Sequence, residues 1–287
     1  MDYVNPDALV STEWLAEHLD APDVRIIDAT SFLPNVPRDP RAEYEECHIP
    51  GAVFFDINDI ADSDNPLPHM LPSAEKFSSK VRKLGLGDGN RIIAYDGNGG
   101  SSASCRAWWM FRVFGHDDVA VLNGGLPKWV AEGRPTDDLP PVSQERHFTA
   151  RQNNFLVRSV EQVIANIDSG REQVVDVRSA GRFAGVDPEP RPSRKKGHIP
   201  GSLNLPTTMF FDANNGGVFR SAEQLHKIVE DADIDLSQPI VTSCGSGVTA
   251  CVAALGLYLI GYKEVAVYDG SWAEWGDHFD TPVESGE

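Results

Sequence analysis

Short apolar runs alternate with longer helical stretches along most of the chain. The runs are four or five residues long and rich in β-branched residues, which is typical of buried strands. They lie at Val24–Ile27, Arg91–Tyr95, Val119–Leu122, Gln173–Val177, Ile240–Ser243 and Glu264–Tyr268, and the helical stretches include Ser73–Leu84, Ser104–Phe114, Ser221–Asp231 and Val248–Leu259. Continuous apolar strands separated by helices predict a parallel sheet that is covered by helices on both faces.

This pattern occurs twice. His48-Ile-Pro-Gly recurs as His198-Ile-Pro-Gly at an offset of 150 residues, and the strand residues Asp28 and Asp176 are 148 apart. Two longer matches follow in the same order, at offsets of 148 and 146: Arg91–Asp96 with Pro239–Cys244, and Asn123–Trp129 with Asp269–Trp275. A tandem duplication of this kind predicts two doubly wound α/β domains, residues 1–140 and 153–287. Three prolines between residues 135 and 152 indicate a linker.

Charge and hydropathy narrow the classes of partner. The formal net charge of −18 argues against nucleic acid, because phosphate binding needs a basic surface. No apolar run reaches the length of a membrane span and no secretory signal is visible, so we expect a cytoplasmic protein without membrane contact. The charge reverses locally, since between Arg178 and His198 six basic residues stand against two acidic ones. This basic island is either a solvated loop or a binding site for a small anion.

Four cysteines (Cys47, Cys105, Cys244 and Cys251) are too few for a disulfide scaffold, and their spacing does not fit a zinc site. They are therefore structural thiols, or one of them is reactive. Cys251 falls inside a predicted helix and is expected to be buried. No chemistry is assigned to Cys47 or Cys105.

Cys244 stands where ligands bind in parallel α/β sheets, at the carboxyl end of a predicted strand and before a helix. The loop Cys244-Gly-Ser-Gly-Val-Thr249 has two glycines within four residues. They let successive N–H groups turn inward as an anion nest, to which the helix N-terminus adds partial positive charge. We expect this loop to stabilise a thiolate. The duplicate carries Asp96 at the matching position, and because a carboxylate cannot carry sulfur, the first domain is predicted to be catalytically silent.

The duplication, the two His-Ile-Pro-Gly segments, Asp269-Gly-Ser-Trp and the Cys244 loop together resemble the rhodanese-type sulfurtransferases over nearly the whole chain. This resemblance implies two tandem rhodanese-like domains and a persulfide carried on Cys244. The uncharged loop is similar to that of family members that take sulfur from 3-mercaptopyruvate. Members that prefer thiosulfate usually have basic residues where Gly245 and Ser246 stand.

The resemblance also implies how the substrate is bound. The segment from Gly181 to Arg191 is similar to the family segment whose two arginines hold a substrate carboxylate, which implies that role for Arg182 and Arg191. Planar guanidinium groups suit this task because they bind a carboxylate through two parallel hydrogen bonds. The remaining loop residues are also expected to contact the substrate; they are Gly245, Gly247, Val248 and Thr249.

A proton relay is the last element that the resemblance implies, with His69 and Ser246 at its positions. The acid that often stands eleven residues before this histidine is Asn58 here. Asn58 could orient the imidazole but could not stabilise its cation. The role of the acid is not carried over to the neighbouring Asp59.

These assignments predict covalent catalysis without a metal or an organic cofactor. Sulfur would pass from 3-mercaptopyruvate to Cys244, releasing pyruvate, and then to a small thiol, cyanide or a dithiol protein such as thioredoxin. The nearest alternative is a thiosulfate:cyanide sulfurtransferase, and a second is a non-enzymatic sulfur carrier or binding module. A phosphatase is disfavoured, because cysteine loops that bind phosphate close with an arginine and none lies between Cys244 and Cys251.

Overall fold

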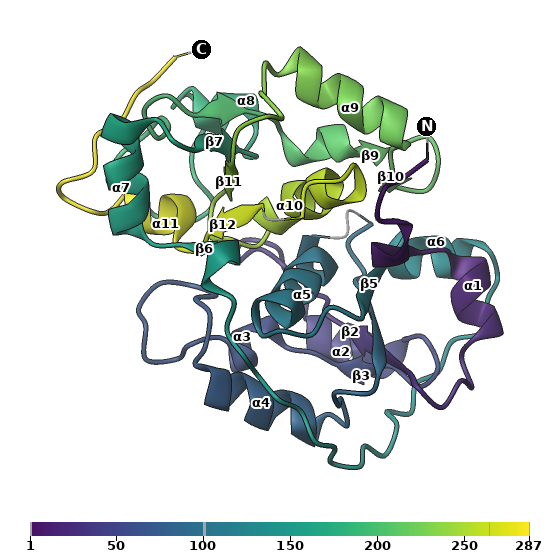
Figure 1. Ribbon diagram of the computed structural model, residues 1–287. Helices are drawn as coiled ribbons and strands as arrows, with labels where there is room; N and C mark the ends of the chain where they lie inside the picture. Colours follow the sequence, from purple (N-terminus) through teal and green to yellow (C-terminus); the bar gives the residue numbers. More distant parts are fainter. Residues whose placement is uncertain (1, 100–101, 264, 287) are drawn as a thin grey trace.

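The computed structural model describes residues 2–99, 102–263 and 265–286, and within them the chain forms two five-stranded parallel sheets (Figure 1). The first sheet has the order β1-β5-β4-β2-β3 and the second the order β6-β12-β11-β7-β8. Position by position these orders are the same, so the duplication read from the sequence is confirmed in the topology. The strands are β1 (Leu9–Val10), β2 (Val24–Asp28), β3 (Val53–Phe54), β4 (Arg91–Tyr95), β5 (Val119–Leu122), β6 (Val157–Arg158), β7 (Gln173–Asp176), β8 (Leu203–Asn204), β11 (Ile240–Ser243) and β12 (Ala266–Tyr268).

Helices cover both faces of each sheet, as the continuous apolar strands predict. In β4, Ile92 and Ala94 belong to one hydrophobic cluster and Ile93 and Tyr95 to another, because successive side chains of a strand point to opposite faces. The α-helices are α1 (Thr12–Glu17), α2 (Pro40–Glu46), α3 (Ile57–Ile60), α4 (Ala74–Lys83), α5 (Ser102–Val113), α6 (Gly125–Ala131), α7 (Val160–Ser169), α8 (Ala180–Phe183), α9 (Ala222–Asp231), α10 (Ala250–Leu259) and α11 (Ser271–Trp275).

Small elements complete each half. Three 3₁₀ turns are η1 (Pro6–Ala8), η2 (Asn154–Leu156) and η3 (Thr207–Phe210), and an antiparallel hairpin pairs β9 (Phe211–Asp212) with β10 (Val218–Phe219). None of these was predicted, because elements of two to four residues carry too little periodicity to be recognised. None of the helices in the described part of the chain is long and apolar enough to span a membrane.

Most predicted elements are confirmed, with shifts of one or two residues at their ends. Ser73 and Ser221 act as N-caps, each accepting a hydrogen bond from the backbone N–H three residues later, so α4 and α9 begin one residue after them. The helix expected from Val248 begins only at Ala250. Gly247 has a φ of +75°, a left-handed conformation that turns the chain away from helical geometry just before this point. The predicted strand start at Glu264 lies outside the described residues.

The two halves meet along α5 and α10, which pack against each other at the centre of the molecule (Figure 1). One hydrophobic cluster contains buried residues of both helices and of both sheets. Trp108 of α5 is 1% exposed, and its ring centroid lies 5.4 Å from that of Tyr258 in α10. Trp109, Trp272 and Trp275 are also buried, as expected for core tryptophans. The chain is therefore two sheets built around one shared core.

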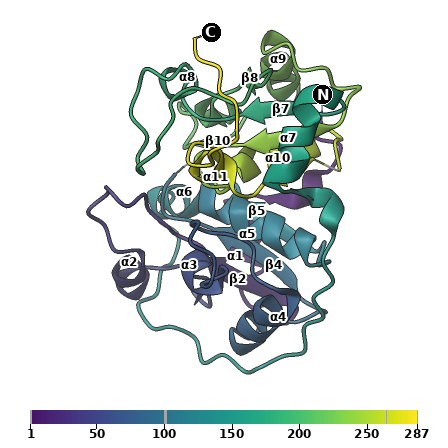
Figure 2. The same ribbon diagram turned by 90° about the vertical axis from the view of Figure 1, so that its left-hand side faces the viewer.

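Segments at the ends of the first half reinforce this contact. The N–H of Val4 donates to the carbonyl of Leu259, and the hydroxyl of Tyr3 donates to the carbonyl of Arg220, so the first residues lie against the second half. The N-terminus is accordingly found beside β10 and α9 (Figure 1). The predicted linker, residues 135–152, runs as an irregular segment along the outside of the first half before β6 begins (Figure 2).

We predict that Trp108→Ala lowers the free energy of unfolding by about 3–5 kcal/mol, because it opens a cavity in the shared core. The measurement is the midpoint of urea unfolding followed by circular dichroism. Val142→Ala is the control, since Val142 is 95% exposed and should leave the midpoint unchanged. Equal midpoints for the two variants would contradict a core shared by α5 and α10.

Candidate functional site

The Cys244 loop connects β11 to α10 at the carboxyl end of an interior strand, as predicted. Its backbone is held by the start of α11. The N–H of Cys244 donates to the hydroxyl of Ser271 at 3.1 Å, and the N–H groups of Trp272 and Ala273 donate to the carbonyls of Cys244 and Gly245 at 3.0 and 2.8 Å. These bonds leave the loop little freedom to move relative to the sheet.

The thiol of Cys244 is enclosed. The residue is only 1% exposed, and the hydroxyl of Ser271 lies 4.0 Å from its sulfur. Ser271 has a φ of +49°, which is unusual for a residue other than glycine and indicates backbone strain. The sequence signal for Ser271 was the Asp-Gly-Ser-Trp element, which was recognised as a motif without a role for its serine.

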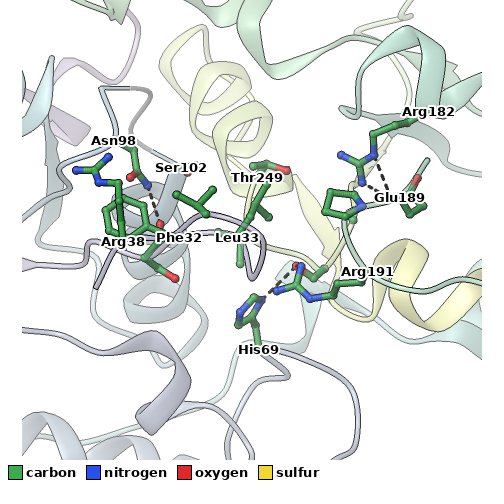
Figure 3. Close-up of a pocket in the computed structure, with 16 residues that line it drawn as sticks. Phe32, Leu33, Arg38, His69, Asn98, Ser102, Arg182, Glu189, Arg191 and Thr249 are labelled. Atoms are coloured by element: carbon green, nitrogen blue, oxygen red, sulfur yellow. Dashed lines mark hydrogen bonds and ion pairs between the residues drawn. The ribbon is translucent and has the colours of Figure 1, made fainter. Parts of the chain in front are cut away.

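A cavity of about 390 Å³ lies over the loop, between the two halves. Figure 3 shows Phe32, Leu33, Arg38 and Asn98 on one side, with Arg182 and Glu189 on the other. The residues that line the cavity are Ser31, Phe32, Leu33, Val36, Arg38, His69, Asn98 and Ser102 from the first half, and Arg182, Glu189, Pro190, Arg191, Gly245, Ser246, Val248 and Thr249 from the second. The structure thus brings most of the predicted site residues together around one cavity, whereas Cys244 and Gly247 lie behind its lining.

Arg182 and Arg191 both face this cavity, but their surroundings differ. The Nε and Nη2 groups of Arg182 donate to the carboxylate of Glu189, which is itself largely buried. Arg191 has no carboxylate partner among the described residues, and its Nη1 lies 3.4 Å from the hydroxyl of Ser246. Burial lowers the pKa of Arg191, and the nearby Cys244 opposes that change. Arg191 is therefore the less neutralised of the two cations.

The other residues of the basic island differ in their surroundings. Arg178 is buried, pairs with Asp176 at 2.6 Å and with Glu189 at 2.7 Å, and stacks on Trp272. The ammonium group of Lys195 donates to the carbonyls of His278 and Thr281, whereas Arg194 and Lys196 are exposed. Charge counting could not separate these residues from ligand-binding ones, because their partners are distant in sequence.

His69 reaches the Cys244 loop from the first half. Its Nδ1 lies 3.2 Å from the hydroxyl of Ser246, and its backbone has a φ of +62°, another strained conformation. Burial, together with the positive charges of Arg191 and Arg106, lowers the pKa of His69 to about 4. The imidazole is therefore neutral near pH 7. It can relay a proton between neighbouring groups, but its protonated form is not populated at that pH.

No acid supports His69 among the described residues. Asn58 and Asp59 are exposed on α3, and Asp59 instead pairs with Lys80 at 2.7 Å. Asp59 is thus engaged by Lys80, and no contact between Asp59 and His69 is present in the described structure. What the structure assembles is a pair, His69 and Ser246, rather than a chain of three groups.

The comparisons with known proteins agree on one family. The rhodanese-like domain matches twice, at residues 11–132 and 159–278. The chain belongs to the rhodanese family. It is 43% identical to the 3-mercaptopyruvate sulfurtransferases of Rattus norvegicus and Homo sapiens, and 45% identical to the thiosulfate sulfurtransferase of Rattus norvegicus. Each alignment covers 93% of this chain and 91% of the relative.

Solved structures give the same answer. SseA from Escherichia coli, described as a 3-mercaptopyruvate sulfotransferase, matches with a TM-score of 0.83 and 38% identity, over 93% of this chain and 99% of SseA. The prediction of tandem rhodanese-like domains and of a sulfurtransferase enzyme is therefore confirmed. The donor remains open at this level, because relatives named for either donor are about equally similar.

The first copy of the rhodanese loop, which follows β4, is filled by its own side chain. The carboxylate of Asp96 is fully buried and accepts hydrogen bonds from the N–H groups of Asn98 and Ser104 at 3.1 and 3.0 Å. An anion nest has therefore formed there, and the protein itself supplies the anion. Gly100, the last residue of that glycine run, lies outside the described residues.

The other cysteines have structural surroundings. Cys105 and Cys251 are fully buried, and burial raises the pKa of both thiols. The thiol of Cys251 donates to the carbonyl of Gly247 at 3.3 Å, so Cys251 is buried as predicted. Cys47 is half-buried and unpaired.

We expect His69 to titrate near pH 4, well below the ordinary histidine value, because the buried, positively charged surroundings disfavour its protonation. An NMR titration of the histidine side chains measures this, with His69→Gln identifying the resonance. The histidine resonances that His69→Gln leaves in place serve as the internal control. A midpoint of about 6.5 for His69 would contradict the described geometry.

Proposed function

We propose that this rhodanese-family chain is a 3-mercaptopyruvate sulfurtransferase in which residues 153–287 carry the catalytic site and residues 1–140 are catalytically silent. The observation that carries the proposal is the cavity in which Arg182, Arg191, Ser246 and His69 surround the loop of the buried Cys244. Within the family, a cysteine in this loop takes up sulfur as a persulfide. Asp96 in the duplicate cannot do so.

The charge around the arginines favours a donor with one negative charge. Arg178, Arg182, Asp176 and Glu189 form one ion-pair network of two guanidinium groups and two carboxylates, so their charges cancel. Arg191 lies outside this network and adds about one positive charge. 3-Mercaptopyruvate is a monoanion, whereas thiosulfate is a dianion. The neutralisation of Arg182 by Glu189 therefore supports the carboxylate donor.

The shape of the loop supports the same choice. A Cβ atom built at Gly245 would lie 2.9 Å from Nη2 of Arg182. A basic side chain at this position, as in thiosulfate-preferring relatives, would crowd and repel the arginine. In this chain Arg182 can approach the loop because residue 245 has no side chain.

The first half-reaction conserves atoms and charge. The Cys244 thiolate attacks the sulfur of 3-mercaptopyruvate; the S–S bond forms as the C–S bond breaks, and its electron pair passes to carbon as the enolate of pyruvate. The proton of the substrate thiol ends on the enolate carbon, which leaves the persulfide as an anion. Ser246 and the neutral His69 lie where they can relay that proton.

An acceptor thiol then attacks the outer sulfur of the persulfide and restores Cys244. The cavity is larger than a three-carbon donor fills, and its far side combines the apolar Phe32, Leu33 and Val36 with polar side chains such as Arg38 and Asn98. This room supports an acceptor bound beside the loop. Small thiols, cyanide and thioredoxin remain the predicted acceptors, and a cytoplasmic location remains a prediction.

We expect Cys244→Ser to abolish pyruvate release from 3-mercaptopyruvate and to leave no mass gain of one sulfur on the protein. The measurements are a pyruvate assay and intact mass spectrometry after donor is added without acceptor. Cys251→Ser is the matched control, because its thiol donates to a carbonyl behind the loop. Retained turnover in Cys244→Ser would end the proposal. In the wild-type protein, a persulfide on Cys244 without turnover would favour the sulfur-carrier alternative.

Thiosulfate sulfurtransferase is the second candidate, favoured by the 45% identity to that relative. We predict that the wild-type protein has the higher kcat/KM with 3-mercaptopyruvate. We further predict that Glu189→Gln shifts the ratio of the two kcat/KM values about tenfold toward thiosulfate, because it frees one positive charge for the dianion.

Asp187→Asn is the control for this shift, since Asp187 is an exposed acid on the same segment and no ion pair joins it to the arginines. A wild-type preference for thiosulfate would overturn the choice of donor. An equal shift in the two variants would show that overall charge, rather than the contact between Glu189 and Arg182, controls the choice.

A further inference from the structure

A buried ion pair joins the two halves behind the Cys244 loop. Arg106 lies on α5 in the first half, and Asp269 follows β12 in the second. Nη1 of Arg106 lies 2.7 Å from Oδ1 of Asp269, and the side chains are 1% and 5% exposed. The guanidinium also stacks on Trp109 at 4.5 Å. Removing two charges from water is costly, so a buried pair of this kind depends on further hydrogen bonds.

Those further bonds go to the two segments that meet at Ser246. Nη2 of Arg106 donates to the carbonyl of His69 at 2.5 Å, and Nη1 donates to the carbonyl of Gly247 at 3.2 Å. Oδ2 of Asp269 accepts the N–H of Leu71 at 2.7 Å. The ion pair therefore fixes both sides of the contact between His69 and Ser246.

The fit around Gly247 is equally close. A Cβ atom at this residue would lie 2.5 Å from the carbonyl oxygen of Asp269 and 3.1 Å from Nη1 of Arg106. Glycine is thus required here both by its left-handed φ and by the approach of the ion pair.

The duplicate serves as an internal comparison, because it keeps the hydrogen bond but lacks the charges. Asn123 occupies the position of Asp269, and its Oδ1 accepts the N–H of Phe219, the counterpart of Leu71, at 2.8 Å. At the offset of 148 residues, Ala254 stands in place of Arg106 and Gly217 in place of His69. Gly217 has a φ of +70° where His69 has +62°. The backbone is conserved between the halves, and the charged pair occurs only beside Cys244.

We propose that Arg106 and Asp269 are positioning residues for sulfur transfer, which hold His69 against Ser246 and fix the turn at Gly247. This inference rests on the proposed function, because it concerns the step in which Cys244 accepts sulfur. The pair acts on that step rather than on donor binding, since Arg182 and Arg191 lie on a separate segment that the pair does not contact in the described structure.

The test compares Asp269→Asn, Arg106→Met and the double variant. We expect each to lower the rate of pyruvate release in a single turnover at saturating 3-mercaptopyruvate by about tenfold or more, with the KM for the donor changed less than about threefold. Asp269→Asn is the mildest change, because Asn123 makes the same hydrogen bond in the other half. If Arg106→Met fails to fold, the rate of Asp269→Asn alone tests the positioning role of the ion pair.

The double variant separates positioning from stability. Removing both charges avoids the unpaired buried charge of the single variants, so its melting temperature should return toward that of the wild type while its rate stays low. A double variant that regains both stability and rate would overturn the proposal. So would an Asp269→Asn protein that keeps the wild-type rate.

Asn123→Ala is the matched control in the other half. It removes the equivalent hydrogen bond, and we expect it to lower stability without changing the single-turnover rate by more than about twofold. An equal loss of rate in Asn123→Ala would reduce the role of the pair to general stability.

A second readout follows the contact itself. In Arg106→Met, loss of the nearby cation should move the His69 titration to higher pH, and a purely structural role elsewhere would leave it in place. The two proposals fail in different experiments. Turnover in Cys244→Ser would contradict the proposed function, whereas a wild-type rate in Asp269→Asn would contradict only the positioning role of the ion pair. If thiosulfate proves to be the donor, the same variants are assayed with thiosulfate.

Discussion

The site depends on one packing interaction, the burial of α5 against α10. Each helix begins directly after the loop that follows the central strand of its own half, the Asp96 loop before α5 and the Cys244 loop before α10. Packing the two helices together therefore places each loop beside the other half. The cavity over Cys244 has walls from both halves for this reason, and neither half would enclose it alone.

Duplication gave the protein two equivalent loops, and side chains have made them different. In the first half a carboxylate fills its own nest. Near that loop Asn123, Ala254 and Gly217 stand where the Cys244 site has an acid, an arginine and a histidine. The backbone conformations remain alike, as the left-handed Gly217 and His69 show. A left-handed φ costs glycine little but strains a histidine. His69 nevertheless retains this conformation, and its imidazole contacts Ser246. Strained non-glycine residues are typical of functional sites, and Ser271 beside Cys244 is a second instance.

Electrostatics at the site come from opposed charges rather than from an excess of one sign. Arg182 is held by Glu189, Arg178 by Asp176 and Glu189, and Arg106 by Asp269. Arg191 alone among these cations lacks a carboxylate partner in the described structure, and it lies against Ser246. Such pairing orients the guanidinium groups and limits the net charge that a donor meets. Burial, together with the charges of Arg191 and Arg106, lowers the pKa of His69 and keeps its imidazole neutral.

The sequence by itself determined the fold class, the duplication and the interior strands, and it singled out Cys244 as the candidate sulfur carrier. These follow from local patterns, namely apolar periodicity, glycine spacing and an internal repeat that compares Cys244 with Asp96. The family resemblance of the segment from Gly181 to Arg191 also grouped Arg182 with Arg191. The sequence did not predict the two-residue strands or the exact first residues of the helices, because local backbone turns, such as the left-handed turn at Gly247, determine where these elements begin.

Only the tertiary structure decided which charges pair. Glu189 was counted as one acid in a basic island, yet it neutralises Arg182. Arg106 and Asp269, 163 residues apart in the chain, carried no signal as a pair until α5 and α10 brought them together. The absence of an acid beside His69 was suggested by Asn58, and the pairing of Asp59 with Lys80 accounts for it. The physical reason is the same throughout: the energy of a charge depends on the partners that burial imposes on it, and those partners come from distant parts of the chain.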